Sequence, residues 1–144
     1  MDVRGSVPSV GTVTSNSFFG MNMGQNIVIQ GQLYSDGIVY DSIEVVEMYL
    51  GDGMDILTVK NTSEAVYLVE LGSGNDSVEV EDVSGPFIVK GGAGADYVRV
   101  ASPANRLDTI SALFMFDGGP NDDENDVLVI DNSGDPNSDD VLNV

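Results

Sequence analysis

Read from residue 92, the chain runs Gly92-Ala93-Gly94-Ala95-Asp96-Tyr97-Val98-Arg99-Val100, and the same pattern recurs elsewhere. Two further copies are Gly51–Val59 and Gly72–Val80. A looser one begins at Asp117–Pro120 and resumes at Asn125–Ile130. The shared aspartate stands at positions 55, 76, 96 and 126, so successive copies are 21, 20 and 30 residues apart. Self-similarity at such a period predicts a repeat architecture.

Each repeat is expected to contribute two short strands. After each aspartate, the second and fourth residues are aliphatic, and alternation along a strand would point both inward. These residues are Leu57 and Val59, Val78 and Val80, Val98 and Val100, and Leu128 and Ile130. A second apolar run precedes each copy, at Val46–Leu50, Val66–Leu71, Phe87–Val89 and Leu113–Phe116.

Units this short leave no room for a crossover helix between parallel strands. We therefore expect an all-β fold, namely a right-handed parallel β-helix or β-roll-like solenoid with about 20 residues per coil. Equivalent residues of successive coils would form ladders, with Glu70 beside Lys90 on the outer face.

The less regular parts of the chain are expected to flank these coils. Residues 1–10 are interpreted as a linker or an added N-terminal segment, and residues 11–144 as a single module. Within it, regular coils would span 46–130 and an acidic tail 131–144. Residues 26–29 and 37–46 are predicted to be strands that start the solenoid, and Pro103–Ala112 a short helix or a lateral loop.

The charge balance limits the possible partners. The chain has 5 Lys and Arg against 24 Asp and Glu, a net charge of −19, and it contains no His and no Cys. Nucleic acid and anionic membrane surfaces are excluded because both need a basic patch. Thiolate and imidazole metal sites are excluded as well. Hard divalent cations would relieve the self-repulsion; a halophilic or merely soluble acidic surface is the alternative.

No stretch of the sequence is long and apolar enough for a transmembrane helix. The N-terminus, Met1–Arg4, shows no signal-peptide pattern. The absence of Cys fits either an intracellular or an extracellular compartment.

The segment Gly91–Arg99 matches the pattern G-G-x-G-x-D-x-U-x at every fixed position and resembles the nonapeptide of hemolysin-type, or RTX, calcium-binding repeats. Two other copies have Leu50 and Leu71 in place of the first glycine. The opposite turns, at 60–64 and 81–85, lack the pattern, so ions are expected along one edge only.

The resemblance implies Ca²⁺ held between adjacent turns by two aspartates and several backbone carbonyls. The expected pairs are Asp55 with Asp76, Asp76 with Asp96, and Asp96 with Asp126. The candidate metal-site residues are Gly51, Asp52, Gly53, Asp55, Gly72, Gly74, Asp76, Gly92, Gly94, Asp96, Asp117 and Asp126. In the alternative interpretation, these turns only satisfy their own backbone geometry.

A broader resemblance covers most of the chain. A strand-like opening at Phe19–Met21, with further runs at Gly37–Tyr40 and Val45–Leu50, and the closing segment Val127–Asp135 are similar to tandem modules of very large secreted or surface proteins of aquatic bacteria and some protists. This implies a non-catalytic structural module of an extracellular or cell-surface protein, with calcium and neighbouring modules as partners.

Three alternatives to this interpretation remain. An adhesion or glycan-binding module would gain support from an exposed aromatic ladder around Tyr49 or Tyr97. A polysaccharide-acting enzyme fragment would gain support from a cleft that places a Lys or Arg beside two carboxylates. Residues 131–139 resemble an EF-hand loop, but Pro136 replaces the glycine and Leu142 the final Glu, so a solvated acidic linker is favoured.

Overall fold

The computed structural model describes residues 8–24, 27–34, 37–120 and 125–136, and these residues form strands and loops with no helix. The strands are β1 (Ser9–Thr14), β2 (Ser17–Gly20), β3 (Ile27–Ile29), β4 (Gln32–Tyr34), β5 (Ile38–Val39), β6 (Val45–Tyr49), β7 (Asp55–Val59), β8 (Val66–Ser73), β9 (Ser77–Val80), β10 (Phe87–Ala93), β11 (Tyr97–Val100), β12 (Phe114–Asp117) and β13 (Val127–Ile130).

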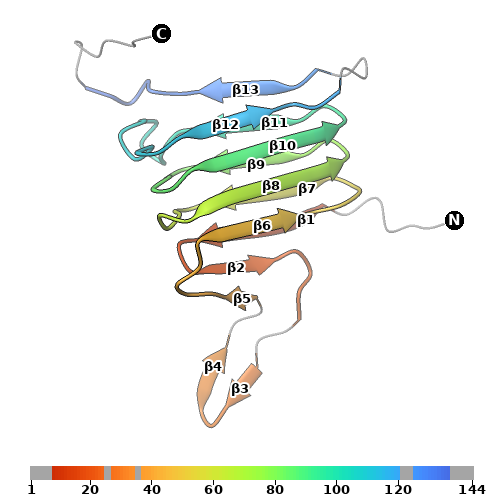
Figure 1. Ribbon diagram of the computed structural model, residues 1–144, viewed down its shortest axis with the longest axis vertical. Coiled ribbons are helices and arrows are strands. Elements are labelled where there is room, and N and C mark those ends of the chain that lie inside the picture. Colours follow the sequence, from red (N-terminus) through yellow and green to blue (C-terminus); the bar gives the residue numbers. More distant parts are fainter. Residues whose placement is uncertain (1–7, 25–26, 35–36, 121–124, 137–144) are drawn as a thin grey trace, which may run out of the picture.

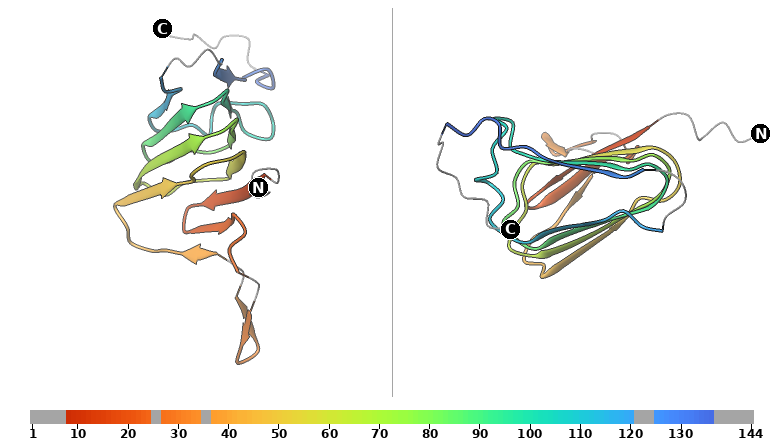
Figure 2. Two further views of the ribbon diagram at one scale, coloured as in Figure 1. Left: turned by 90° about the vertical axis from the view of Figure 1, so that its right-hand side faces the viewer. Right: turned by 90° about the horizontal axis from the view of Figure 1, so that it is seen from above.

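These strands form three sheets (Figure 1). A seven-stranded sheet has the order β13-β11-β9-β7-β1-β2-β5, and a four-stranded sheet has the order β12-β10-β8-β6. The third sheet is the hairpin β3–β4, which projects from the N-terminal end of the molecule. Seen from above, the two larger sheets form opposite walls of one flattened layer pair (Figure 2).

From β6 onward, the chain passes alternately between the two larger sheets, and each strand pairs in parallel with the strand one repeat away. In the seven-stranded sheet, Leu57 is opposite Val78, and Val98 is opposite both Val78 and Leu128. In the four-stranded sheet, Phe87 is opposite both Tyr67 and Phe114. The repeat period therefore sets the register.

The core lies between the two larger sheets and contains the residues predicted to point inward. In the seven-stranded sheet, Leu57, Val59, Val78, Val80 and Val98 are each at most 1% exposed. From the four-stranded sheet come Tyr67, Val69, Phe87 and Val89, all fully buried. The Tyr67 and Phe87 rings stack with centroids 5.7 Å apart, and the Phe87 and Phe114 rings do so at 6.3 Å.

The prediction of one right-handed parallel β-helix or β-roll-like solenoid is wrong. The longest sheet is mixed, because β1 pairs antiparallel with β2, and β2 antiparallel with β5. Two residues join β1 to β2, which suits a hairpin and excludes a parallel pair. These N-terminal strands do not carry the glycine–aspartate repeat, so its period could not predict their pairing.

Two further segments differ from expectation, and a third matches one of its two alternatives. Strand β1 begins at Ser9, inside the segment interpreted as a linker, and pairs in parallel with β7. The expected strand at 37–46 is divided into β5 and the start of β6. Residues 103–112 form a lateral loop of turns, which was one of the two alternatives for them.

No described strand covers the C-terminal end of the stack. Leu128 and Ile130, which continue the inward rows of Val98 and Val100, are 44% and 62% exposed. Among the described residues, β13 pairs only with β11, and β12 only with β10. The tail predicted from residue 131 is described only as far as 136, so most of it lies outside the described residues.

Candidate functional site

Three of the four repeat aspartates form a buried row at the glycine-rich edge of the molecule. Asp55, Asp76 and Asp96 are 4%, 2% and 1% exposed. Asp55 and Asp76 occupy equivalent places at the start of the paired strands β7 and β9. Because neighbouring strands lie roughly 4.8 Å apart, this is the expected distance between the two Cα atoms. The fourth member, Asp126, continues the row but is exposed at the uncovered end.

Three carboxylates of this row, those of Asp76, Asp96 and Asp126, accept a backbone hydrogen bond from the preceding repeat. The amide N–H of Asp55 donates to Oδ1 of Asp76 at 2.7 Å, and that of Asp76 to Oδ1 of Asp96 at 3.0 Å. The N–H of Asp96 donates to Oδ1 of Asp126, also at 3.0 Å. One oxygen of each of these three acceptors therefore joins adjacent repeats. The sequence interpretation missed this role, although the return of one aspartate in each repeat was its signal.

The second carboxylate oxygens of Asp55 and Asp76 have a different environment. Oδ2 of Asp55 and Oδ2 of Asp76 are buried and have no hydrogen-bond partner. A buried carboxylate oxygen without a donor is unfavourable. A bound cation, a proton or an ordered water would remove this energetic cost.

The titration behaviour of these two groups follows from their burial. Desolvation raises the pKa of Asp76 to about 6, and the neighbouring charges of Asp96 and Asp55 act in the same direction. The hydrogen bond from the Asp55 amide opposes this shift. Desolvation also raises the pKa of Asp55, against a hydrogen bond from Ser9. Near neutral pH, the row thus holds negative charge at an energetic cost.

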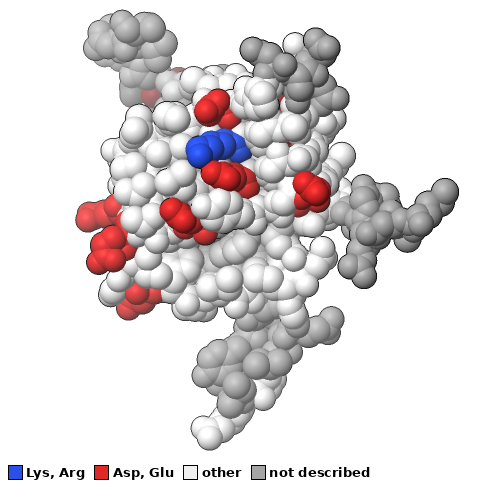
Figure 3. Space-filling model, turned by 45° about the vertical axis from the view of Figure 1, so that its right-hand side comes forward, with Lys and Arg blue, Asp and Glu red and all other residues white. Residues whose placement is uncertain are grey.

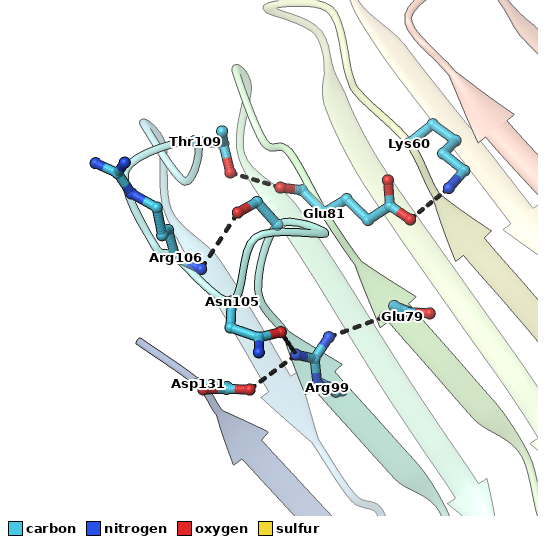
Figure 4. A network of polar contacts seen from close by, with 9 residues as sticks. Lys60, Glu79, Glu81, Arg99, Asn105, Arg106, Thr109 and Asp131 are labelled. Carbon is cyan, nitrogen blue, oxygen red and sulfur yellow. Dashed lines mark hydrogen bonds and ion pairs between the residues drawn. The ribbon is translucent and has the colours of Figure 1, made fainter. Parts of the chain in front are cut away.

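Within the described part of the chain, no Lys or Arg forms an ion pair with Asp55 or Asp76. Lys60 pairs with Glu81, Lys90 with Glu70, Arg99 with Glu79 and Asp131, and Arg106 with Asp108. Figure 4 shows that Arg99 also reaches Asn105, 2.7 Å away. Figure 3 shows acidic side chains spread over one face of the molecule, with few basic ones among them. The described ion pairs leave Asp55 and Asp76 out.

The glycines of the turns let successive repeats stack closely. Gly72 has φ +106°, and a Cβ at this position would lie 1.9 Å from the carbonyl oxygen of Gly51. The same close approach relates the other predicted glycines one repeat apart: Gly74 to Gly53, Gly92 to Gly72, and Gly94 to Gly74. Backbone stacking therefore accounts for these glycines whether or not an ion is bound.

The first position of the nonapeptide shows where the carboxylates lie. At Gly91, a Cβ would meet Oδ2 of Asp96 at 2.3 Å, and at Gly118 it would meet Oδ2 of Asp126 at 2.2 Å. The equivalent Leu71 is instead fully buried in the core. In the two later repeats, the carboxylate thus occupies the space beside the first residue of the turn.

Two of the candidate metal-site residues lie away from the row. Asp52 is exposed and forms an isolated β-bridge with Ser73. Asp117 is exposed on β12 in register with Lys90, and its Oδ1 accepts a hydrogen bond from the amide of Gly119. The structure thus brings together Asp55, Asp76, Asp96 and Asp126, but no described contact joins Asp52 or Asp117 to them.

The opposite edge has its own stacking contacts, which the sequence interpretation missed. Thr62 is 4% exposed, and its Oγ1 accepts hydrogen bonds from the amides of Ser84 (2.8 Å) and Gly85 (3.3 Å). A Cβ at Gly85 would lie 2.2 Å from the carbonyl oxygen of Ala65. This edge is therefore built from a buried hydroxyl, a close-packed glycine and the buried Glu81, which pairs with Lys60.

The oxygen donors at the glycine-rich edge fit a hard cation in part. Ca²⁺ takes six to eight oxygen ligands. Among the described residues, no three Asp, Glu, His or Cys side chains gather closely enough to hold a metal. The remaining ligands would be turn carbonyls such as those of Gly51 and Ser73. Each already accepts one backbone hydrogen bond but keeps a second lone pair.

No family model, curated protein or solved structure matches the chain. The resemblance to RTX repeats therefore depends on the nonapeptide pattern alone. No helix in the described residues has the length and apolarity needed to cross a membrane.

Proposed function

We propose that this chain is a non-catalytic structural module whose aspartate row binds Ca²⁺, and that the bound ion stiffens the stacked repeats. The observation that carries the proposal is the pair of buried, unpartnered oxygens, Oδ2 of Asp55 and Oδ2 of Asp76. In a chain of net charge −19, a hard cation would supply the missing partner and relieve the repulsion along the row.

In this proposal, Asp76 is the central ligand. It has a row neighbour on each side, Asp55 and Asp96, and the charges of both raise its pKa. Asp126 would contribute to an ion on one side only. Backbone carbonyls of the glycine turns would complete the shell, and Oδ1 of each acid would keep its hydrogen bond to the preceding repeat.

Equilibrium dialysis against Ca²⁺ tests this assignment with isosteric variants. Asp76→Asn keeps an oxygen that can accept the Asp55 amide but removes the charge, so it should lose more bound calcium than Asp126→Asn. A wild-type protein that binds no calcium at millimolar concentration would refute the proposal. Equal losses in the two variants would refute the central position of Asp76.

The partners proposed with this function are neighbouring modules of a longer extracellular or cell-surface protein. The C-terminal end supports this, because no described strand pairs with the outer edges of β12 and β13, and Leu128 and Ile130 of the inward rows remain exposed there. A following module with the same repeat would extend both sheets and cover these two side chains.

The catalytic alternative keeps its support, because one hollow places a Lys beside two carboxylates, although this Lys is not itself a general base. Lys90 lies between Glu70 and Asp117 in the sheet register and lines a hollow of about 300 Å³ with them. Its Nζ is 2.9 Å from Oε1 of Glu70, and this hydrogen bond raises the pKa of Lys90 above its ordinary value. The ammonium group therefore stays protonated at neutral pH and cannot accept a proton from a substrate.

The described residues contain no aromatic ladder of the kind that an adhesion or glycan-binding module would need. Tyr49 and Tyr97 are 68% and 40% exposed but belong to different sheets. The register neighbours of Tyr97 are Ser77 and Val127, and that of Tyr49 is Glu70. Two isolated rings do not form the continuous stacking surface that a glycan chain needs.

A further inference from the structure

The two larger sheets end at different levels on the N-terminal side. Beyond β7, the seven-stranded sheet continues through β1, β2 and β5, whereas the four-stranded sheet stops at β6 (Figure 2, left). On the C-terminal side, three more strands follow β7 in the seven-stranded sheet, and three more follow β6 in the four-stranded sheet. At the N-terminal end, no described strand of the four-stranded sheet faces β1, β2 and β5, and the space left beside β6 is here called the notch. At the C-terminal end, both sheets end after the same number of strands.

Two hollows open into this notch. One of about 290 Å³ lies beside Asp41 and Glu64, and one of about 220 Å³ lies beside Phe18 and Met48. They share Tyr40 and Ile43 as lining residues, so they are adjacent, and the two together are here called the β6 groove.

The edge of β6 that borders this groove is unpaired among the described residues. The carbonyl of Glu44 accepts the amide of Val66, and the amide of Leu50 donates to Glu70, so the even-numbered backbone groups face β8. Because this direction alternates along a strand, the N–H and C=O groups of Val45, Glu47 and Tyr49 face the open side. They form a strand edge that can accept another strand.

The walls of the groove define what could fill it. The β6 half is apolar, with Phe18, Ile38, Val46 and Met48, and Ile38 is 56% exposed there. The other half is polar and contains Asp41 and Glu64. Glu47 also lines the β6 half, and no Lys or Arg lines either hollow.

We infer that the β6 groove binds an extended segment of a partner protein, which adds a strand to β6. Backbone groups repeating every second residue are matched only by another extended chain. Alternate apolar side chains of that segment would pack over Val46 and Met48. A Lys or Arg at one end would meet Asp41 and Glu64. A free second copy of this chain is disfavoured in chelator, because nothing then offsets the net charge of −19 on each copy.

The inference is independent of calcium binding and can be tested in chelator. The probe is a fluorescently labelled synthetic peptide of alternating Val and Thr with two Lys residues at one end, titrated into the whole chain and followed by anisotropy. Saturable binding is expected. Asp41→Asn combined with Glu64→Gln, and separately Ile38→Ser, should each weaken it at least tenfold without changing the circular dichroism spectrum.

A matched control is Met115→Ser. Met115 is 44% exposed on β12, which has an open edge at the other end of the molecule, so this variant should bind the peptide as the wild type does. Loss of binding in this variant alone would place the peptide on β12 and overturn the inference. A peptide with two Asp residues in place of the lysines should bind at least tenfold more weakly.

Amide hydrogen exchange locates the added strand. Saturating peptide should slow exchange at Val45, Glu47 and Tyr49 at least tenfold, while Val46 and Met48 are already protected by β8. Unchanged rates at the three odd-numbered residues would overturn strand addition. Peptide-sensitive dimers in sedimentation would show instead that a second copy occupies the groove.

Discussion

The backbone amide of Asp55 donates a 2.7 Å hydrogen bond to Oδ1 of Asp76, 21 residues later in the chain. The next repeat contains the same relationship between Asp76 and Asp96, at 3.0 Å. One oxygen of each acceptor therefore joins adjacent repeats without an ion. Oδ2 of Asp55 and Oδ2 of Asp76 have no hydrogen-bond partner and are available to bind an ion. Variants of a single residue can separate these two roles.

The comparison of Asp76→Asn with Asp76→Ala measures how much the hydrogen bond from the Asp55 amide contributes to stability. Asparagine keeps an oxygen for the Asp55 amide, whereas alanine leaves that buried amide without an acceptor. In chelator, the free energy of unfolding should be lower for the alanine variant by about 1–3 kcal/mol, as measured by urea denaturation. Equal stabilities would mean that the hydrogen bond contributes nothing.

The raised pKa of Asp76, at about 6, predicts how stability depends on pH in chelator. The folded state holds this proton more tightly than the unfolded state, so the contribution to stability is fully present below about pH 4. It is lost as the pH rises through about 6. A shift of about two pKa units corresponds to a loss of up to about 3 kcal/mol.

Urea denaturation between pH 4 and pH 7.5 measures this loss. Asp76→Asn should show a flatter profile over the same range, because the titrating group is gone. A wild-type profile that rises from pH 4 to 7 would contradict the burial account of the shift.

The glycine turns give a matched pair of substitutions. Gly51 and Gly72 have nearly equal φ angles, +105° and +106°. An added Cβ meets nothing within 4 Å at Gly51 but lies 1.9 Å from a carbonyl oxygen at Gly72. Gly51→Ala should cost about 1–3 kcal/mol of backbone strain. Gly72→Ala should cost several kcal/mol more or prevent folding. Thermal unfolding of both variants decides the matter, and similar melting temperatures would contradict the close stacking.

The inward row of the seven-stranded sheet offers another matched pair. Leu57 is 1% exposed, and Leu128, in the equivalent place at the uncovered end, is 44% exposed. Leu57→Ala should lower the free energy of unfolding by about 2–5 kcal/mol. Leu128→Ala should cost about 1 kcal/mol or less in the isolated chain. Equal costs in denaturant titrations would show that this end is covered.

Two copies of the sequence joined in tandem test whether modules stack. If the second copy extends the sheets at β12 and β13, Leu128 and Ile130 of the first copy become buried. The joined chain should then melt at a higher temperature than the single module in calcium, because stacking adds a nearest-neighbour term. Identical melting curves would show independent units and argue against neighbouring modules as partners.

Sequence reasoning succeeded where the repeat is strong. The Asp-x-U-x-U pattern correctly predicted the inward residues from Leu57 to Val100, and Lys90 was correctly placed beside Glu70, with an Nζ–Oε1 distance of 2.9 Å. The RTX resemblance implied that Asp55, Asp76, Asp96 and Asp126 pair one repeat apart, and the hydrogen bonds between repeats join them in that order, while ion binding by these pairs stays a prediction. In each case, a period of one repeat translates directly into parallel register.

The same reasoning failed where the period is absent. The antiparallel pairing of β1, β2 and β5 depends on the two-residue connection between Thr14 and Ser17, and it made the longest sheet mixed. The pattern also could not separate two roles of one carboxylate. An aspartate one repeat away can serve the backbone through Oδ1 and leave Oδ2 for another partner, and only the geometry distinguishes these oxygens.

Calcium binding by the aspartate row is tested most directly by thermal unfolding at pH 7.5, in calcium and in chelator, for the wild type and Asp76→Asn. Selective binding to the folded state adds about 2.7 kcal/mol at a hundredfold excess over Kd. The wild-type melting temperature should therefore rise with calcium concentration, and that of Asp76→Asn should rise much less. Equal melting temperatures of the wild type in calcium and in chelator would contradict the account.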